Sequence, residues 1–256
     1  MKSYFETQIY SLNLPVYLGC IVVKDYFRNF FCSFSFQLIP ITVLLFCSTI
    51  LLIINGTGYS IDNFSILEKN IVIDQSGFIH LLGEIRNTSN ETQRSITAYA
   101  NFYDKNGQNI GNGSGIVSLR SLNTGQVSPF EIIFLDKNQT KHFFNYTLNF
   151  TSEIGQQKPD SIVITSLKSR PDIFGYYYVS GRISNMGNDT ATNVLAIASF
   201  FDSNGKIIGL SSAITEPSNM TSHSTASFTV VMDDKLQSPK IKNYSLTVDS
   251  DQYASK

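Results

Sequence analysis

The chain has 256 residues with a formal net charge of −1, and only 15% of its residues are charged. A protein that binds nucleic acid normally carries a basic face, so this composition argues against nucleic-acid partners. All three cysteines lie among the first 61 residues, which excludes a disulfide framework and a thiolate metal site from the remainder. That remainder is rich in Asn, Ser, Thr and Gly and in Ile, Val, Phe and Tyr, a mixture typical of strands and turns.

An uncharged apolar segment comes first in the chain. No charged residue occurs from Asn29 to Ile61, and residues 30–55 contain the run LIPITVLLFCSTILLII. About 25 such residues cross a hydrocarbon core roughly 30 Å thick, so residues 30–55 are predicted to form a transmembrane helix in contact with membrane lipid. Basic residues slightly outnumber acidic ones in the preceding segment, residues 1–29. This bias predicts a cytoplasmic or interfacial N-terminal segment, with the rest of the chain on the extracellular side.

A cleaved signal peptide is the alternative to a retained anchor. The leader would be unusually long, and Asn55-Gly56-Thr57-Gly58 is a poor cleavage site, so a retained anchor is preferred. Asn-x-Ser/Thr triplets occur only after the apolar core of this segment, in keeping with an external location. Four of them recur at matching positions of the repeat described next and are predicted glycosylation sites: Asn90 with Asn188, and Asn145 with Asn243.

Residues 62–152 are repeated without a gap 98 positions further on, as residues 160–250. The matched positions include Gly83 with Gly181, Asn87 with Asn185, Phe102 with Phe200, Asp104 with Asp202, Gly107 with Gly205 and Tyr146 with Tyr244. A unit of about 90 residues is large enough to be a domain with its own apolar core. The first copy and the second copy are therefore predicted to be two domains, and residues 153–159 a short linker that limits their relative movement.

Alternating apolar residues predict strands in each copy. Residues 79–85 and 177–183 alternate with period two, as do residues 96–102 and 194–200. Asp104-Lys-Asn-Gly107 and Asp202-Ser-Asn-Gly205 follow, and Asn-Gly with a preceding Asp is a strong hairpin signal. Further strands are predicted at residues 130–135 and 142–150 and at their counterparts. Several short strands without a helical period predict an all-β fold of antiparallel β-sandwiches.

Each copy resembles the FxLYD domain, an immunoglobulin-like module of bacterial and archaeal envelope proteins. The first copy carries the resemblance in Gly83-Glu-Ile-Arg-Asn87, Ala100-Asn-Phe-Tyr-Asp104, Asn106-Gly107 and Gly111, and the second copy in the corresponding positions. The resemblance implies two tandem immunoglobulin-like β-sandwiches behind the transmembrane helix. Its motif marks strands and a hairpin, so it implies an extracytoplasmic location and no catalytic residues.

Candidate catalytic and metal-binding residues are sparse. The three histidines, His80, His142 and His223, have no histidine at their counterparts and no spacing typical of a zinc site. A hydrolytic arrangement of distant His, Ser and Asp residues stays open. Asp104 and Asp202 lack the Gly and Glu positions of a calcium-binding loop, and Asp233-Asp234 is a weak calcium candidate, so turn stabilisation is preferred for all of them. No cofactor is expected.

Phe78, His80, Tyr176 and Tyr178 are the predicted surface binding residues, because they lie on the outward face of the alternating strands. Exposed aromatic side chains stack on sugars or anchor a protein partner, although cross-strand packing explains them as well. The sequence therefore favours a non-enzymatic, membrane-anchored extracytoplasmic protein with a protein or glycan partner. The alternatives are an accessory or sensory ectodomain of a larger membrane complex, and an outlying hydrolase or ligand-binding protein.

Overall fold

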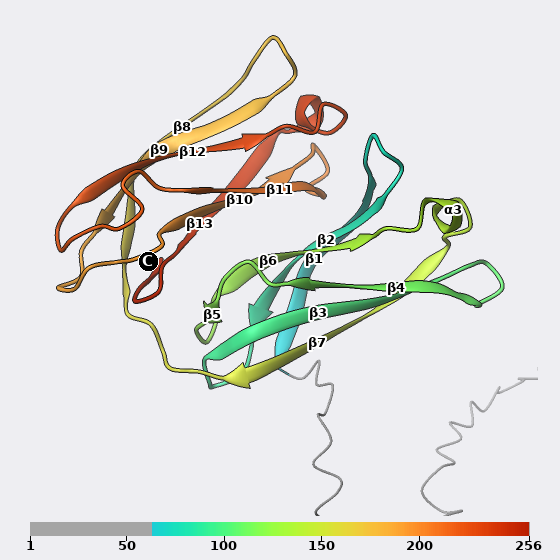
Figure 1. The fold of residues 1–256 in the computed structure, drawn as a ribbon, viewed down its shortest axis with the longest axis horizontal. Coiled ribbons are helices and arrows are strands. Elements are labelled where there is room, and N and C mark those ends of the chain that lie inside the picture. Colours follow the sequence, from blue (N-terminus) through green and yellow to red (C-terminus); the bar gives the residue numbers. More distant parts are fainter. Residues whose placement is uncertain (1–62, 256) are drawn as a thin grey trace, which may run out of the picture. The chain divides into compact units, whose positions relative to one another are not determined.

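Residues 63–255, which the computed structural model describes, form an all-β fold (Figure 1). They belong to one compact unit, Gly58–Lys256. The predicted N-terminal segment, residues 1–29, and the predicted transmembrane helix, residues 30–55, lie outside the described residues. Within residues 63–255, no helix has the length and apolar character needed to cross a bilayer.

The strands recur at the 98-residue spacing of the sequence repeat. In the first copy they are β1 (Phe64–Ile73), β2 (Ile79–Asn87), β3 (Gln93–Tyr103), β4 (Asn109–Ile116), β5 (Ser121–Leu122), β6 (Val127–Phe134) and β7 (Asn145–Ile154). In the second they are β8 (Asp160–Pro171), β9 (Tyr177–Asn185), β10 (Leu195–Phe201), β11 (Ile207–Ile214), β12 (Thr225–Met232) and β13 (Asn243–Asp249), followed by β14 (Ala254–Ser255). One helical turn, α3 (Lys137–Thr140), follows β6, and a 3-10 turn, η1 (Ser238–Lys240), follows β12.

Each copy has a sandwich-like arrangement of two groups of paired strands. In the first copy β2 pairs with β1 and β6, while β3 pairs with β4 and β7. In the second copy β9 pairs with β8 and β12, while β10 pairs with β11 and β13. All of these pairs are antiparallel, whereas the short strand β14 pairs in parallel with β8. The short strand β14 joins β13 to β8, so the strands of the second copy form one continuous seven-stranded sheet.

The alternating residues predicted for the core are buried. Ile96, Ala98, Ala100 and Phe102 of β3 lie in the first hydrophobic cluster, and Val194, Ala196, Ala198 and Phe200 lie in the second. Large aromatic rings fill the space left by the small alanines, with the ring centroids of Phe102 and Phe134 4.7 Å apart. The predicted strand faces are therefore confirmed.

Asn87 and Asn185 explain why the repeat keeps an asparagine at the end of β2 and β9. Both side chains are fully buried. The amide Nδ2 of Asn87 donates to the carbonyl oxygens of Glu91 and Leu122, and that of Asn185 donates to those of Asp189 and Met220. These bonds satisfy backbone groups where the chain leaves one sheet for the other, so the residue is structural.

The predicted hairpins are confirmed in both copies. The carboxylate of Asp104 accepts hydrogen bonds from the N–H groups of Asn106 and Gln108, and Asp202 accepts from those of Asn204 and Lys206. The N–H of Lys206 is the main cause that holds the pKa of Asp202 below its usual value. Both carboxylates thus stabilise turns, as the preferred interpretation expected.

The outward faces of β1 and β2 pack against the second copy. Val72 and Leu82 form a small hydrophobic cluster with Ile207, against which Phe201 and Leu210 also pack. Leu82 lies on the face of β2 away from its own core, as the alternation implies, and the second copy covers it there. β7 also continues to Ile154, so the connection to β8 consists of residues 155–159 rather than 153–159.

A buried carboxylate links the two copies at one end of this contact. Asp249, whose side chain is only 2% exposed, accepts hydrogen bonds from Arg120 Nε at 2.7 Å and from Lys158 Nζ at 2.8 Å. Arg120 belongs to the first copy, Lys158 to the connection and Asp249 to the end of β13. Arg120 also pairs with Asp251 and donates to the carbonyl of Asn193. Ion pairs therefore join both the first copy, through Arg120, and the connection, through Lys158, to the second copy.

Candidate functional site

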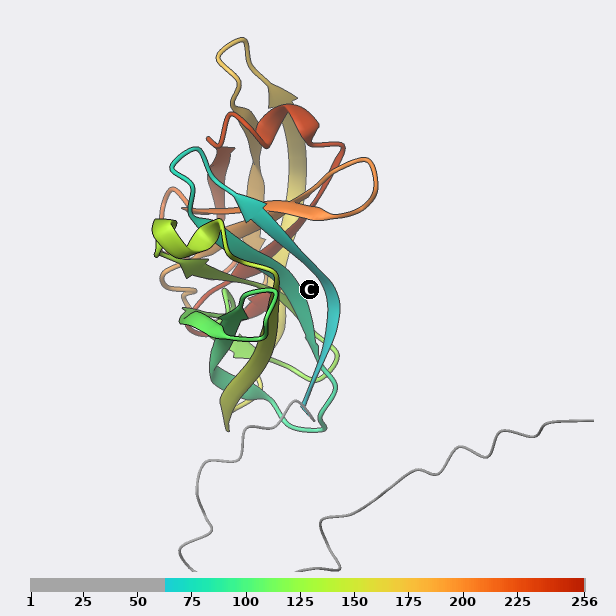
Figure 2. The same cartoon turned by 90° about the vertical axis from the view of Figure 1, so that its right-hand side faces the viewer.

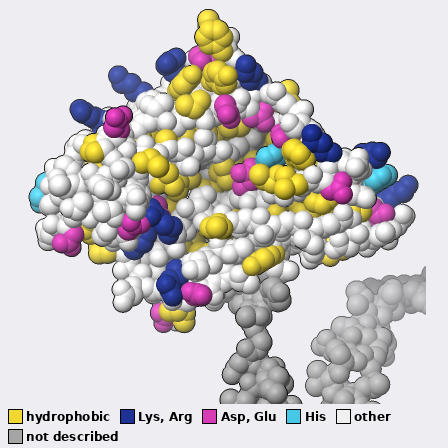
Figure 3. Space-filling model, in the orientation of Figure 1, with side chains coloured by type: hydrophobic (Ala, Val, Ile, Leu, Met, Phe, Trp, Pro, Cys, Tyr) yellow, Lys and Arg dark blue, Asp and Glu magenta, His cyan; other side chains and the backbone are white. Residues whose placement is uncertain are grey.

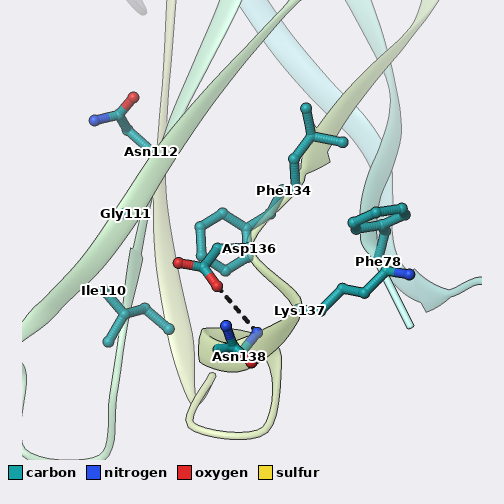
Figure 4. Close-up of a pocket in the computed structure, with 9 residues that line it drawn as sticks. Phe78, Ile110, Gly111, Asn112, Phe134, Asp136, Lys137 and Asn138 are labelled. Atoms are coloured by element: carbon teal, nitrogen blue, oxygen red, sulfur yellow. Dashed lines mark hydrogen bonds between the residues drawn. The ribbon is translucent and has the colours of Figure 1, made fainter. Parts of the chain in front are cut away.

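A surface pocket of about 670 Å³ lies in the first copy between the start of β2, the start of β4 and α3 (Figure 4). Its lining residues are Phe78, Ile110, Gly111, Asn112, Phe134, Leu135, Asp136, Lys137 and Asn138. Gly111 has a φ of +147° and leaves room for the ring of Phe134, because a Cβ atom there would lie 2.5 Å from that ring. The lining therefore combines an aromatic floor with a polar rim.

The helical turn α3 holds the polar residues at the edge of the pocket in place. The carboxylate of Asp136 caps α3 by accepting hydrogen bonds from the N–H groups of Asn138, at 3.0 Å, and Gln139 (Figure 4). This cap places the ammonium group of Lys137 over the ring of Phe78, 4.5 Å from the ring centroid. Phe78 thus lies at the outward position that the sequence predicted, and its ring is half-buried beneath a cation.

The second copy repeats this cation–aromatic pair. Lys235 and Tyr176 are the counterparts of Lys137 and Phe78, and Lys235 Nζ lies 5.1 Å from the centroid of Tyr176. Tyr178, two residues further on, lies under Arg170 at 4.8 Å. Both tyrosines are half-buried. The four predicted binding residues therefore lie in two separate groups, one at the start of each copy's second strand.

His80 lies in an acidic cluster. Its Nδ1 lies 2.6 Å from Glu131 Oε1, its Nε2 lies 3.5 Å from Asp74 Oδ2, and its side chain is 20% exposed. The hydrogen bond to Glu131 raises the pKa of His80 above its usual value, and the charges of Glu131 and Asp74 add to this effect against partial burial. The ring is consequently a structural partner of the two carboxylates rather than a free imidazole.

We predict that Glu131→Gln lowers the pKa of His80 toward its usual value, because it removes both the hydrogen bond and the charge of Glu131. An NMR titration of the imidazole carbon-bound protons measures this shift, with the distant exposed variant Glu153→Gln as control. Because the pKa is raised in the folded state, the ion pairs stabilise the fold fully below the unfolded value near 6.5 and are lost as the pH rises through the folded value. An unchanged pKa of His80 in Glu131→Gln would contradict the interaction between His80 and Glu131.

A second, smaller cavity of about 180 Å³ lies between the two copies. The first copy contributes Val72, His80, Leu82 and Glu131, and the second contributes Ile208, Gly209, Leu210, Met232, Asp233 and Asp234. The second-copy residues are the counterparts of the pocket lining from Ile110 to Asn112 and from Phe134 to Asp136. The surface that is open in the first copy is therefore covered by a neighbouring module in the second.

The predicted glycosylation sites are accessible. Asn90, Asn145, Asn188 and Asn243 are all exposed. Asn87, by contrast, also begins an Asn-x-Ser/Thr triplet but is fully buried, so it is not available for modification. Whether the four exposed sites carry glycans stays a prediction.

The remaining chemistry-bearing side chains are dispersed. His142 is exposed after α3, and His223 is exposed in the turn before β12. Among residues 63–255, no group of three His, Cys, Asp or Glu side chains is placed to hold a metal ion. Asp233 and Asp234, the weak calcium candidate, line the cavity between the copies, and Asp234 accepts hydrogen bonds from the following turn.

Comparisons with known proteins show only distant likeness. No family model matches the sequence, and no curated protein matches it. Among solved structures, an exo-chitosanase of Amycolatopsis orientalis is 10% identical with a TM-score of 0.28, over 73% of this chain and 26% of that one. Red sea bream transglutaminase is 10% identical with a TM-score of 0.25, over 80% and 31%. A Bacteroides uniformis β-glucuronidase is 11% identical with a TM-score of 0.28, over 74% and 27%. The chain thus spans about a quarter to a third of the length of these proteins.

Proposed function

We propose that this chain is a non-enzymatic, membrane-anchored extracytoplasmic protein whose two immunoglobulin-like modules of FxLYD type bind a protein partner. In this proposal the apolar segment at residues 30–55 is the membrane anchor, and the two modules lie on the extracellular side. One observation carries the binding role. The pocket beside Phe78 is open in the first copy, while the corresponding surface of the second copy receives another β-module.

The covered surface of the second copy indicates how the open one would be used. There, residues from an outward sheet face, Val72, Leu82 and His80, approach the start of β11 and the end of β12. The fold can therefore accept a sheet face at this edge without change in its strands. A protein with a similar sheet face is the partner that this geometry favours.

The polarity of the open surface limits which kinds of partner surface would fit it. Ile207, Leu210 and Phe201 in the covered surface correspond to Asn109, Asn112 and Tyr103 in the open one. The partner face should consequently be more polar than that of the first copy and should offer hydrogen-bond donors and acceptors. Lys137 and Asp136 place one positive and one negative charge at the rim, which favours charged groups of both signs on the partner.

The non-enzymatic part of the proposal rests on the roles of the acidic side chains. Asp104, Asp136 and Asp202 accept hydrogen bonds from turn or helix N–H groups, and Asp249 is paired with Arg120 and Lys158. The carboxylates of Asp74 and Glu131 hold His80. These groups are committed to the fold and leave the pocket without a nucleophile and base held together.

We expect a photo-crosslinking residue at Asn138, on the pocket rim, to capture one protein when the full chain is irradiated in its native membranes. The matched control is the same residue at Thr124, which is exposed in the turn between β5 and β6. Mass spectrometry identifies the captured species. A product from Asn138 that is absent from Thr124 supports the proposal, and identical products or none from both positions contradict it. A captured integral membrane protein at equal stoichiometry would favour the accessory-subunit alternative.

A further inference from the structure

The tip of the β8–β9 hairpin carries two exposed apolar side chains. Ile173 is 92% exposed and Phe174 is 67% exposed. Gln75 and Ser76 occupy the same positions in the first copy. The two tips therefore differ in polarity while the copies share the fold.

The turn itself does not require the apolar pair. In the first copy the N–H of Gly77 donates to the carbonyl of Asp74, and the N–H of Phe78 donates to the Asp74 carboxylate. The second copy makes the same bonds from Gly175 and Tyr176 to Asp172. A polar pair and an apolar pair thus support one turn geometry, so Ile173 and Phe174 are not explained by folding.

Aromatic and basic side chains follow behind the tip. Tyr176 lies under Lys235 and Tyr178 lies under Arg170. Leu236, next to Lys235, is 49% exposed, whereas its counterpart in the first copy is Asn138. The side chains at the tip are therefore apolar, and those further from the tip are tyrosines, each covered by a cationic side chain. Figure 3 shows hydrophobic atoms at the apex of this hairpin with Lys or Arg side chains on both sides.

We propose that this hairpin tip inserts into the surface of a lipid bilayer that carries anionic headgroups. The order of side chains matches the order of environments at such a surface. Isoleucine and phenylalanine suit the acyl region, tyrosine suits the interface, and Lys and Arg reach the headgroups while their stems cover apolar surface. Each cation near an anionic leaflet adds to the attraction.

The nearby acidic groups do not oppose this attraction strongly. The carboxylate of Asp172 accepts hydrogen bonds from the N–H groups of Phe174 and Tyr176 inside the turn. Asp233 and Asp234 line the cavity between the copies, beside His80. The carboxylates of Asp172 and Asp234 are thus each engaged by N–H groups of their own turns.

A lipid surface fits the tip better than a protein partner does. The hairpin projects beyond the other strands in both views of the fold (Figure 1 and Figure 2). A narrow projecting tip buries little area against another protein but inserts readily into a fluid surface. This inference concerns the second copy and is independent of the pocket in the first, so either can fail alone.

The absence of tryptophan from the chain allows a direct test. Phe174→Trp in the full-length protein places a single tryptophan at the tip, and Ser76→Trp places one at the matching tip of the first copy. Both proteins are reconstituted in phosphatidylcholine–phosphatidylserine liposomes. Brominated phosphatidylcholine, which quenches tryptophan on contact, is included either in the same bilayer or in added protein-free vesicles. The two arms identify which bilayer the tip enters.

We expect Phe174→Trp to show blue-shifted emission that is quenched in one of the two arms, while Ser76→Trp is quenched in neither. Adding Ile173→Gln should weaken the apparent affinity roughly tenfold, because one apolar side chain no longer inserts. Adding Arg170→Gln with Lys235→Gln should remove the preference for phosphatidylserine, at roughly fivefold for each cation.

Two results would overturn the proposal. Water-exposed emission of Phe174→Trp without quenching in both arms would show that the tip stays in solvent. Blue-shifted emission without quenching would show that a protein surface, from this chain or a second copy, covers the tip instead. Thermal unfolding of each variant provides the folding control, since Ile173 and Phe174 make no core contact in the hydrophobic clusters.

Discussion

Replacing Asp249 by asparagine is expected to lower the free energy of unfolding by about 3 kcal/mol. The substitution keeps the shape of the side chain but removes the negative charge shared by Arg120 and Lys158. The side chain of Lys158 is only 12% exposed and would be left with an uncompensated charge beside the carbonyl of Ser250. The penalty of a buried unpaired charge exceeds the loss of an exposed ion pair, so the effect should be large.

Denaturant unfolding followed by circular dichroism measures this change. The matched control is Glu153→Gln, which removes the exposed ion pair between Glu153 and Arg94 and should cost less than about 1 kcal/mol. Equal effects of the two substitutions would mean that Asp249 is not the electrostatic link between the copies.

The second large effect is expected from Leu82→Ser combined with Ile207→Asn. Both side chains are essentially buried in the cluster between the copies, and each loss should cost about 3 kcal/mol. Each replacement is the residue that the other copy carries at that position, Ser180 and Asn109. Each copy should therefore still fold, because its own core remains unchanged, while the contact between the copies is lost.

Hydrogen exchange separates these two consequences. The amides of β1, β2, β10 and β11 that face the contact should exchange faster in the double variant, while those of β6 and β12 keep their protection. Uniform loss of protection throughout both copies would instead indicate that the substitutions disrupt the cores, and the cluster would not be a separate contact.

The sequence predicted much of the fold because the signals were local. The alternating residues in β3 and β10 and the Asn-Gly hairpins state which face is buried and where the chain turns. Because the sequence is repeated, the same pattern appears twice, at matching positions of the two copies. This is why the core positions Phe102 and Phe200 and the turn carboxylates Asp104 and Asp202 could be assigned correctly without the structure.

The first strand of each copy was not predicted. β1 and β8 have irregular burial, since each contains a register shift, and much of β8 is exposed. A pattern of alternating apolar residues is therefore absent from them. The two-residue strand β14 also escaped prediction, because its pairing with β8 depends on the tertiary position of the C-terminal segment.

The contact between the copies is visible in the sequence only when the two copies are compared position by position. On the face of β10 away from its own core, Leu195 and Ile197 stand where β3 has Thr97 and Tyr99. Ile197 is buried in the first copy's cluster, whereas Tyr99 is exposed. An apolar residue in one copy at a position that is polar in the other indicates a covered face.

The four predicted binding residues illustrate the limit of reasoning from one strand. Alternation placed Phe78, His80, Tyr176 and Tyr178 away from the core, but it gave no information on side chains from other strands. Lys137 and Lys235 come from the turns after β6 and β12, and Glu131 comes from β6 itself. These long-range partners convert apparently free aromatic groups into half-buried pairs, and they also create the pocket rim.

The binding role proposed for the open pocket depends on the two copies being docked as one unit, since this contact covers one pocket and leaves the other open. Calorimetry of the full chain is the most direct measurement. We predict a single unfolding transition for the β-region, with equal calorimetric and van't Hoff enthalpies. Two separate transitions, or a calorimetric enthalpy about twice the van't Hoff value, would show that the copies unfold independently and would contradict the docked arrangement.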